Sequence, residues 1–191
     1  MKLAMIAALA LVAAVSASYP RLTTLGGDAR LMLNDYTEMW AYPGTVSDYQ
    51  FATGQSDTPE SMDDGWFGLV KNFSGTTLGV TINHGDMLEF LYHPGNWGLI
   101  VGVDYEKATV DTNTSAKEMG VDLAWGTEVG WFGDYSDLAL GLGYMTSDST
   151  IGDVSFGPTE INLGGSVRGH QDGFINLFPI ISAGYDSYEY D

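Results

Sequence analysis

Apolar and hydrophilic residues alternate strictly between positions 119 and 131. The odd positions carry large apolar side chains or threonine, and the even positions carry glycine, alanine, aspartate or glutamate. A repeat of two places successive side chains on opposite faces of a β-strand. This segment is therefore expected to be a strand with one apolar face and one small or charged face.

The same alternation recurs clearly at 97–106 and 138–145 and more weakly at 78–82, 88–92 and 161–167. Two more segments, 66–73 and 174–185, read as strands with mixed faces. The sequence thus predicts one all-β domain of about eight or nine antiparallel strands. The only helix expected is short. It would run from Thr37 to Met39, capped by Asn34 or Asp35 and ended by Pro43-Gly44.

Three features favour a transmembrane β-barrel over a soluble sandwich. The alternating runs at 97–106 and 119–131 reach the roughly 9–11 residues that a tilted strand needs to cross a bilayer. Small and acidic residues occupy the opposite face, which suits a polar lumen better than a shared apolar core. Aromatic residues bracket the apolar stripes, as in the interfacial girdles of lipid-facing strands; these are Trp97, Tyr105, Trp125 and Trp131.

The connections between these strands are expected to differ in length. Ser74-Gly75 and residues 93–96 read as tight turns. By contrast, residues 53–64, 107–117 and 147–158 are polar and are expected to be long loops. Short turns on one side and long loops on the other are typical of outer-membrane barrels.

The start of the chain predicts export. Lys2 precedes an apolar run at 3–15 that ends in small residues, so residues 1–18 read as a signal peptide.

The chain has no cysteine, which favours a closed, hydrogen-bonded fold over a disulfide-stapled module. Its formal charge of −18 would repel nucleic acids, so none is expected as a partner. The expected location is the bacterial outer membrane, with its lipid as the main partner.

Residues 20–45 resemble the N-terminal region of the fatty-acid-transporter-like outer-membrane barrels. Leu25, Gly26 and Gly27 match the family's first element, Asp35 and Thr37 match its short helix, and Trp40 and Pro43 match its turn. Tyr42 and Gly44 depart from the usual Asn and Ala of that turn. The resemblance implies a hatch-like segment at 19–45, a barrel at 46–191, and a hydrophobic small molecule as ligand.

Four acidic residues are expected to face the lumen, because they lie on the hydrophilic faces of their strands: Asp104, Glu106, Asp122 and Glu128. Arg168 and Lys71 are candidate partners for these carboxylates. An open lumen lined in this way would favour cations. A lumen filled by side chains and paired charges is the alternative, and a barrel of about eight strands favours it.

No catalytic residue, cofactor or metal site is predicted. His84, His93 and His170 are the only histidines, and neither a Gly-x-Ser-x-Gly nor a His-Glu-x-x-His motif accompanies them. Acidic loop pairs such as Asp63-Asp64 lack calcium-site spacing and read better as solvated charge.

The expected function is passage or binding of a hydrophobic small molecule, or a structural barrel role, and not catalysis. Two alternatives stay open. One is a secreted, soluble, acidic β-sandwich that binds sugar or calcium, which would need a second sheet over the apolar face. The other is an outer-membrane barrel hydrolase, which would need a histidine within hydrogen-bond reach of a serine or aspartate.

Overall fold

The computed structural model describes residues 36–55, 65–84, 86–111, 114–131, 135–151, 154–170 and 180–190. The predicted signal peptide and most of the hatch-like segment, including Leu25, Gly26, Gly27 and Asp35, lie outside these residues. The strands are β1 (Phe51–Gln55), β2 (Trp66–Phe73), β3 (Thr76–Ile82), β4 (Leu88–His93), β5 (Gly98–Asp111), β6 (Thr114–Val129), β7 (Tyr135–Ile151), β8 (Val154–Phe156), β9 (Pro158–His170) and β10 (Ile180–Tyr190).

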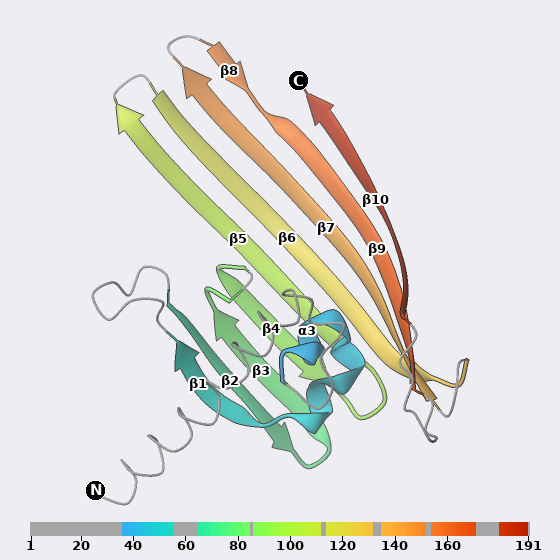
Figure 1. Ribbon diagram of the computed structural model, residues 1–191. Coiled ribbons are helices and arrows are strands. Elements are labelled where there is room, and N and C mark those ends of the chain that lie inside the picture. Colours follow the sequence, from blue (N-terminus) through green and yellow to red (C-terminus); the bar gives the residue numbers. More distant parts are fainter. Residues whose placement is uncertain are drawn as a thin grey trace, which may run out of the picture.

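The strands form one antiparallel sheet, which confirms the all-β prediction. Nine of them follow one another in the order β1-β2-β3-β4-β5-β6-β7-β9-β10, and the short β8 pairs with the end of β7. The strands β5, β6, β7 and β9 are much longer than β1 to β4 (Figure 1). Within the described residues β1 and β10 are the two edges of the sheet and do not pair with each other, so the sheet is open.

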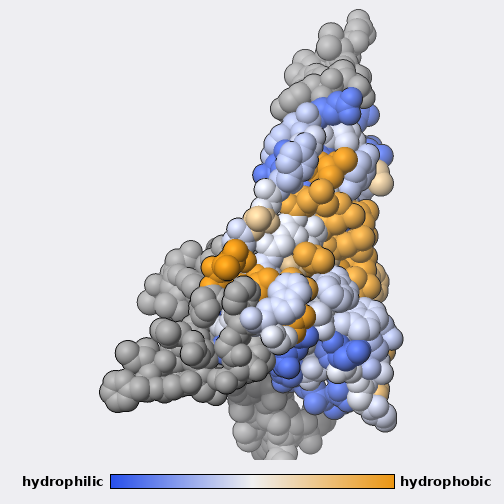
Figure 2. Space-filling view, turned by 90° about the vertical axis from the view of Figure 1, so that its right-hand side faces the viewer, coloured by the Kyte–Doolittle hydropathy of each residue, from blue (hydrophilic) through white to orange (hydrophobic). Residues whose placement is uncertain are grey.

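The outer face of this sheet is apolar and exposed. Its large side chains include Phe67, Leu69, Phe73, Leu78, Ile82, Phe90, Tyr92, Tyr105, Met119, Val121, Leu123, Leu140, Leu142, Tyr144, Ile161, Leu163, Ile181 and Tyr185. Figure 2 shows apolar surface gathered in a zone with hydrophilic surface above and below it. The alternating sequence pattern therefore separates an apolar face from a polar one, as expected from a period of two.

Two of the expected long loops are largely strands. β5 continues to Asp111 and β6 begins at Thr114, so 107–117 is a two-stranded extension of the sheet. The stretch at 147–158 likewise holds the end of β7 and all of β8. Their polar side chains suggested loops, but each also contains β-branched residues, such as Thr109 and Val110 or Thr150 and Ile151, which favour extended backbone. Residues 53–55 belong to β1.

Two short helices pack on the inner face of the sheet: α3 (Glu38–Ala41) and the 3-10 helix η2 (Pro43–Asp48). Their side chains Met39 and Val46 form the core of the described region with Val70, Leu91 and Ile100 from the sheet. Pro43 ends α3 as expected but also begins η2, and Thr37 is the N-cap of α3. No helix in the described ranges is long and apolar enough to cross a membrane.

The close fit of η2 against the sheet depends on a glycine. A side-chain carbon added at Gly98 would lie 1.7 Å from the carbonyl oxygen of Pro43. Only a residue without a side chain lets the two backbones approach this closely. The inner helices, defined as residues 38–48, are thereby seated on β5.

Candidate functional site

Several buried charged residues of the described region meet where the inner helices pack on the sheet. On one side Arg168 of β9, only 1% exposed, lies between two carboxylates. Its Nη2 donates to Glu38 Oε2 at 2.9 Å and to Asp137 Oδ2 at 2.7 Å, and its Nε donates to Asp137 Oδ2 at 3.0 Å. A buried guanidinium needs such partners, because an unpaired charge in the interior is costly.

Tyr42 and Tyr49 also contact this group of three charges. The Tyr42 ring packs against the guanidinium of Arg168, 4.4 Å from ring centre to Cζ, and its hydroxyl shares a 3.0 Å hydrogen bond with Ser166. The Tyr49 hydroxyl donates to Glu38. Burial raises the pKa of Glu38, although the Tyr49 hydrogen bond and the charge of Arg168 both act to lower it.

His170 joins the same cluster. Its Nε2 lies 2.6 Å from Asp137 Oδ2, the oxygen that also accepts from Arg168. The side chains of His170 and Asp137 are 7% and 10% exposed. This histidine-aspartate pair has hydrogen-bond geometry, but it is buried and already engaged by Arg168, so its geometry fits a structural role better than attack on a substrate.

On the other side, Trp40 ties α3 to the strands β3 and β4. Its Nε1 donates to Glu89 Oε2 at 3.1 Å, and Glu89 also accepts from the hydroxyl of Thr81. The ring of His84 stacks on Trp40 at 3.7 Å between ring centres. The indole of Trp40 is thus hydrogen-bonded to a strand residue, Glu89, which is itself held by Thr81 of the neighbouring strand.

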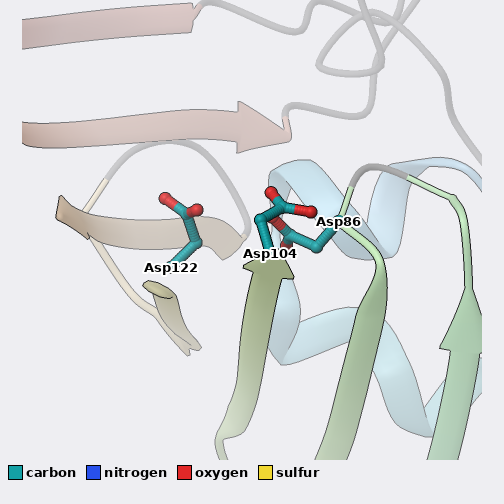
Figure 3. A group of neighbouring side chains, drawn as sticks. All are labelled: Asp86, Asp104 and Asp122. Carbon is teal, nitrogen blue, oxygen red and sulfur yellow. The ribbon is translucent and has the colours of Figure 1, made fainter. Parts of the chain in front are cut away.

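Three further carboxylates converge nearby, from the turn before β4 and from β5 and β6 (Figure 3). One oxygen of each of Asp86, Asp104 and Asp122 lies within 4.8 Å of the others. Gly102 makes room for Asp86, since an added side-chain carbon there would lie 1.7 Å from Asp86 Oδ2. Burial, together with the hydrogen bond and charge of Asp104, raises the pKa of Asp86 to about 8. Such a group can share protons, and its oxygens suit a hard cation.

Two cavities lie beside Trp40, and both are also lined by Ala124. The larger, about 410 Å³, is bounded mainly by glycine, alanine and serine residues of β7, β9 and β10. The smaller, about 300 Å³, is bounded by His84, Asp86, Glu89 and Asp122 among others. Both volumes are at the scale of small-molecule sites.

The expected lumen residues separate into two groups. Asp104 and Asp122 lie on the inner face and meet each other, whereas Glu106 and Glu128 lie farther along β5 and β6 and are exposed. Arg168 is on the inner face, but its partners are Glu38 and Asp137 and not the four expected carboxylates. Lys71 lies exposed on the outer side, with its Nζ 3.2 Å from Gln50 Oε1.

The expected girdle and hatch residues are also placed. Tyr105 and Trp131 are exposed, while Trp97 and Trp125 are half-buried, and Trp97 packs edge-on against Tyr92. Of the matched hatch positions within the described residues, Trp40 and Pro43 belong to the inner helices.

Sequence reasoning missed Glu38, Asp86, Glu89 and Asp137, and it weighed His170 only as a possible catalytic group. One signal was available: Arg168 and His170 are two apart in one strand and therefore share a face. Glu38 and Asp137 gave no comparable signal, because they meet Arg168 only through the packing of α3 and the pairing of β7 with β9.

No protein-family model, curated protein or solved structure matches the chain.

Proposed function

We propose that the protein is an exported outer-membrane β-barrel that binds or passes a hydrophobic small molecule, or serves as a structural barrel. The observation that carries this proposal is the exposed apolar outer face. Leu140, in the middle of β7, is 50% exposed, and Ile181 on β10 is 63% exposed. Soluble monomers rarely expose contiguous apolar patches larger than a few hundred Å². Lipid would cover this face.

The inner face supports the same proposal from the other side. It carries small residues, buried ion pairs and the inner helices, which together resemble a filled or partly filled lumen. The cavity of about 410 Å³ beside Trp40 gives room for a small apolar ligand. Trp40 lines this cavity and Pro43 begins the neighbouring helix η2. These two residues carry the resemblance to the turn of the fatty-acid-transporter-like barrels.

In a membrane the two edge strands, β1 and β10, could not keep an unpaired edge. Backbone donors and acceptors left unpaired in lipid cost several kcal/mol each, so a spanning sheet must have no free edge. In the membrane, β1 and β10 must therefore each pair with a further strand, in addition to the pairings seen among the described residues.

Cell fractionation followed by a heat-modifiability gel tests the proposal. We expect the protein in the outer-membrane fraction, resistant to extraction with urea, and running at a different mobility before and after boiling. Recovery in the soluble periplasm with one mobility would overturn the proposal and favour the soluble binding module.

A further inference from the structure

Two lysines face each other across the pairing of β5 with β6. Lys107 is the direct register partner of Lys117, two residues beyond the pair Tyr105 and Met119. The pair between them, Glu106 and Glu118, points to the opposite face. Both lysines are exposed, and both lie on the outer face, because they are two residues from outward-facing side chains in their strands.

This pairing is unusual for such an acidic chain. The protein has 7 Lys and Arg against 25 Asp and Glu, so chance would rarely place two cations side by side. Like charges directly opposite each other destabilise a sheet. Asp148 of β7 is the direct register partner of Lys117 on its other side, yet within the described residues neither lysine lies within ion-pair distance of a carboxylate. Both ammonium groups are therefore available to an external anion.

The level of the pair along the strands indicates the kind of anion. Below it begins the exposed apolar zone, with Tyr105 and Met119 as its last members on β5 and β6. The Lys117 ammonium lies 5.9 Å from the centre of the Tyr105 ring. A lysine beside an aromatic ring at the end of an apolar zone is the arrangement found at headgroup depth.

The side of the membrane follows from the turns. The tight Ser74-Gly75 turn and residues 94–97 connect strands at the end opposite to the β5–β6 hairpin. At the hairpin end β5 and β6 extend past the apolar zone, through residues 107–111 and 114–117. In outer-membrane barrels the longer connections lie on the outside and the short turns face the periplasm. The lysine pair would then face the outer leaflet.

We infer that Lys107 and Lys117 bind the phosphate of an anionic lipid headgroup in that leaflet. The inference rests on the proposed barrel function. Opposed side chains in antiparallel strands begin roughly 4.5–5.5 Å apart, so two flexible lysines can converge on one phosphate. Tyr105 and Met119 lie below to contact the glycerol and acyl chains.

The test uses the full chain in non-ionic detergent, titrated separately with phosphatidylglycerol and phosphatidylcholine and followed by native mass spectrometry. We expect the wild type to retain phosphatidylglycerol preferentially. Replacing both lysines, Lys107→Gln with Lys117→Gln, should weaken that preference by about twenty-five-fold at low salt, roughly fivefold per lysine. The double Lys→Arg variant should keep it, and added salt should reduce it. Lys71→Gln is the matched control, since Lys71 is a single exposed lysine on β2, and it should behave as the wild type.

Equal binding of the two lipids by a wild type that still shows the heat-dependent mobility shift would overturn the lipid site and leave the barrel intact. Displacement of phosphatidylglycerol by millimolar inorganic phosphate would instead assign the pair to free phosphate and overturn the lipid source. A wild type without the mobility shift would overturn the barrel and this inference together.

Discussion

Arg168 shows at the level of single residues why the inner helices stay in place. Its guanidinium holds Asp137 in the wall and Glu38 in α3 at the same time. We expect Arg168→Met to lower the free energy of unfolding by about 3–5 kcal/mol, because it removes the guanidinium that pairs with both buried carboxylates. The midpoint of urea unfolding, followed by tryptophan fluorescence in detergent, measures this. Lys71→Gln removes an exposed cation and should change the midpoint little; a similar loss in both variants would contradict the role of Arg168.

Glu38 provides a prediction about pH. Its pKa in the folded protein is raised above 4.5 by burial, so the folded state binds its proton more tightly than the unfolded state does. Stability from this group is therefore fully present below pH 4.5 and is lost as the pH rises through the raised pKa. We expect Glu38→Gln to flatten that part of the profile of unfolding free energy against pH. An unchanged slope above pH 4.5 would show that Glu38 does not titrate differently on folding.

The sequence could place single residues on a face but could not find their partners. Alternation within β5 and β6 was enough to assign Asp104 and Asp122 to the inner face. The third member of their cluster, Asp86, lies in a turn, where no periodicity applies. It fits there only because Gly102 of β5 has no side chain, and the sequence does not show that the turn and β5 lie side by side. The same holds for Arg168, whose face was predictable and whose partners Glu38 and Asp137 were not.

At the level of elements, the contact of η2 with β5 depends on Gly98. Gly98→Ala would push its new methyl group into the Pro43 carbonyl, so η2 or β5 must move. We expect a loss of roughly 1–3 kcal/mol, the usual cost of overpacking, and faster proteolysis of the inner helices. Gly164→Ala in β9 is the matched control, because an added carbon there meets nothing within 4 Å. Equal protease resistance of the two variants would argue against tight docking of η2.

Strands were predictable where they carry an apolar face and were missed where they do not. The segments at 97–106, 119–131 and 138–145 lie within β5, β6 and β7 apart from their extreme ends. Their continuations at 107–117 and 147–158 lack apolar alternation, because both faces there are polar. Backbone pairing with a neighbouring strand extends β5, β6 and β7 beyond the apolar zone, and that pairing leaves no periodic signal in the side chains.

For the whole molecule, the separation of an apolar outer face from a polar inner face bears on whether water or lipid surrounds the sheet. The interior that the described residues share is small: five buried apolar side chains form its core. Most large apolar residues point outward. In water this arrangement would leave the apolar outer face exposed, whereas in a bilayer lipid would cover the same face.

A charge placed on the outer face distinguishes these two solvents. Leu140 lies near the middle of the apolar stretch of β7, and Thr146 lies on the same strand and face at its end. In a lipid-facing strand an arginine costs about 2–4 kcal/mol at the bilayer midplane and about 0–1 kcal/mol near the interface. We therefore expect Leu140→Arg to lower the unfolding free energy in phosphatidylcholine vesicles by several times as much as Thr146→Arg. In water an exposed arginine would be tolerated at both positions, because neither site would have to desolvate the charge. Equal and small effects of the two substitutions would thus contradict a lipid-facing surface, whereas a graded loss with depth would support it.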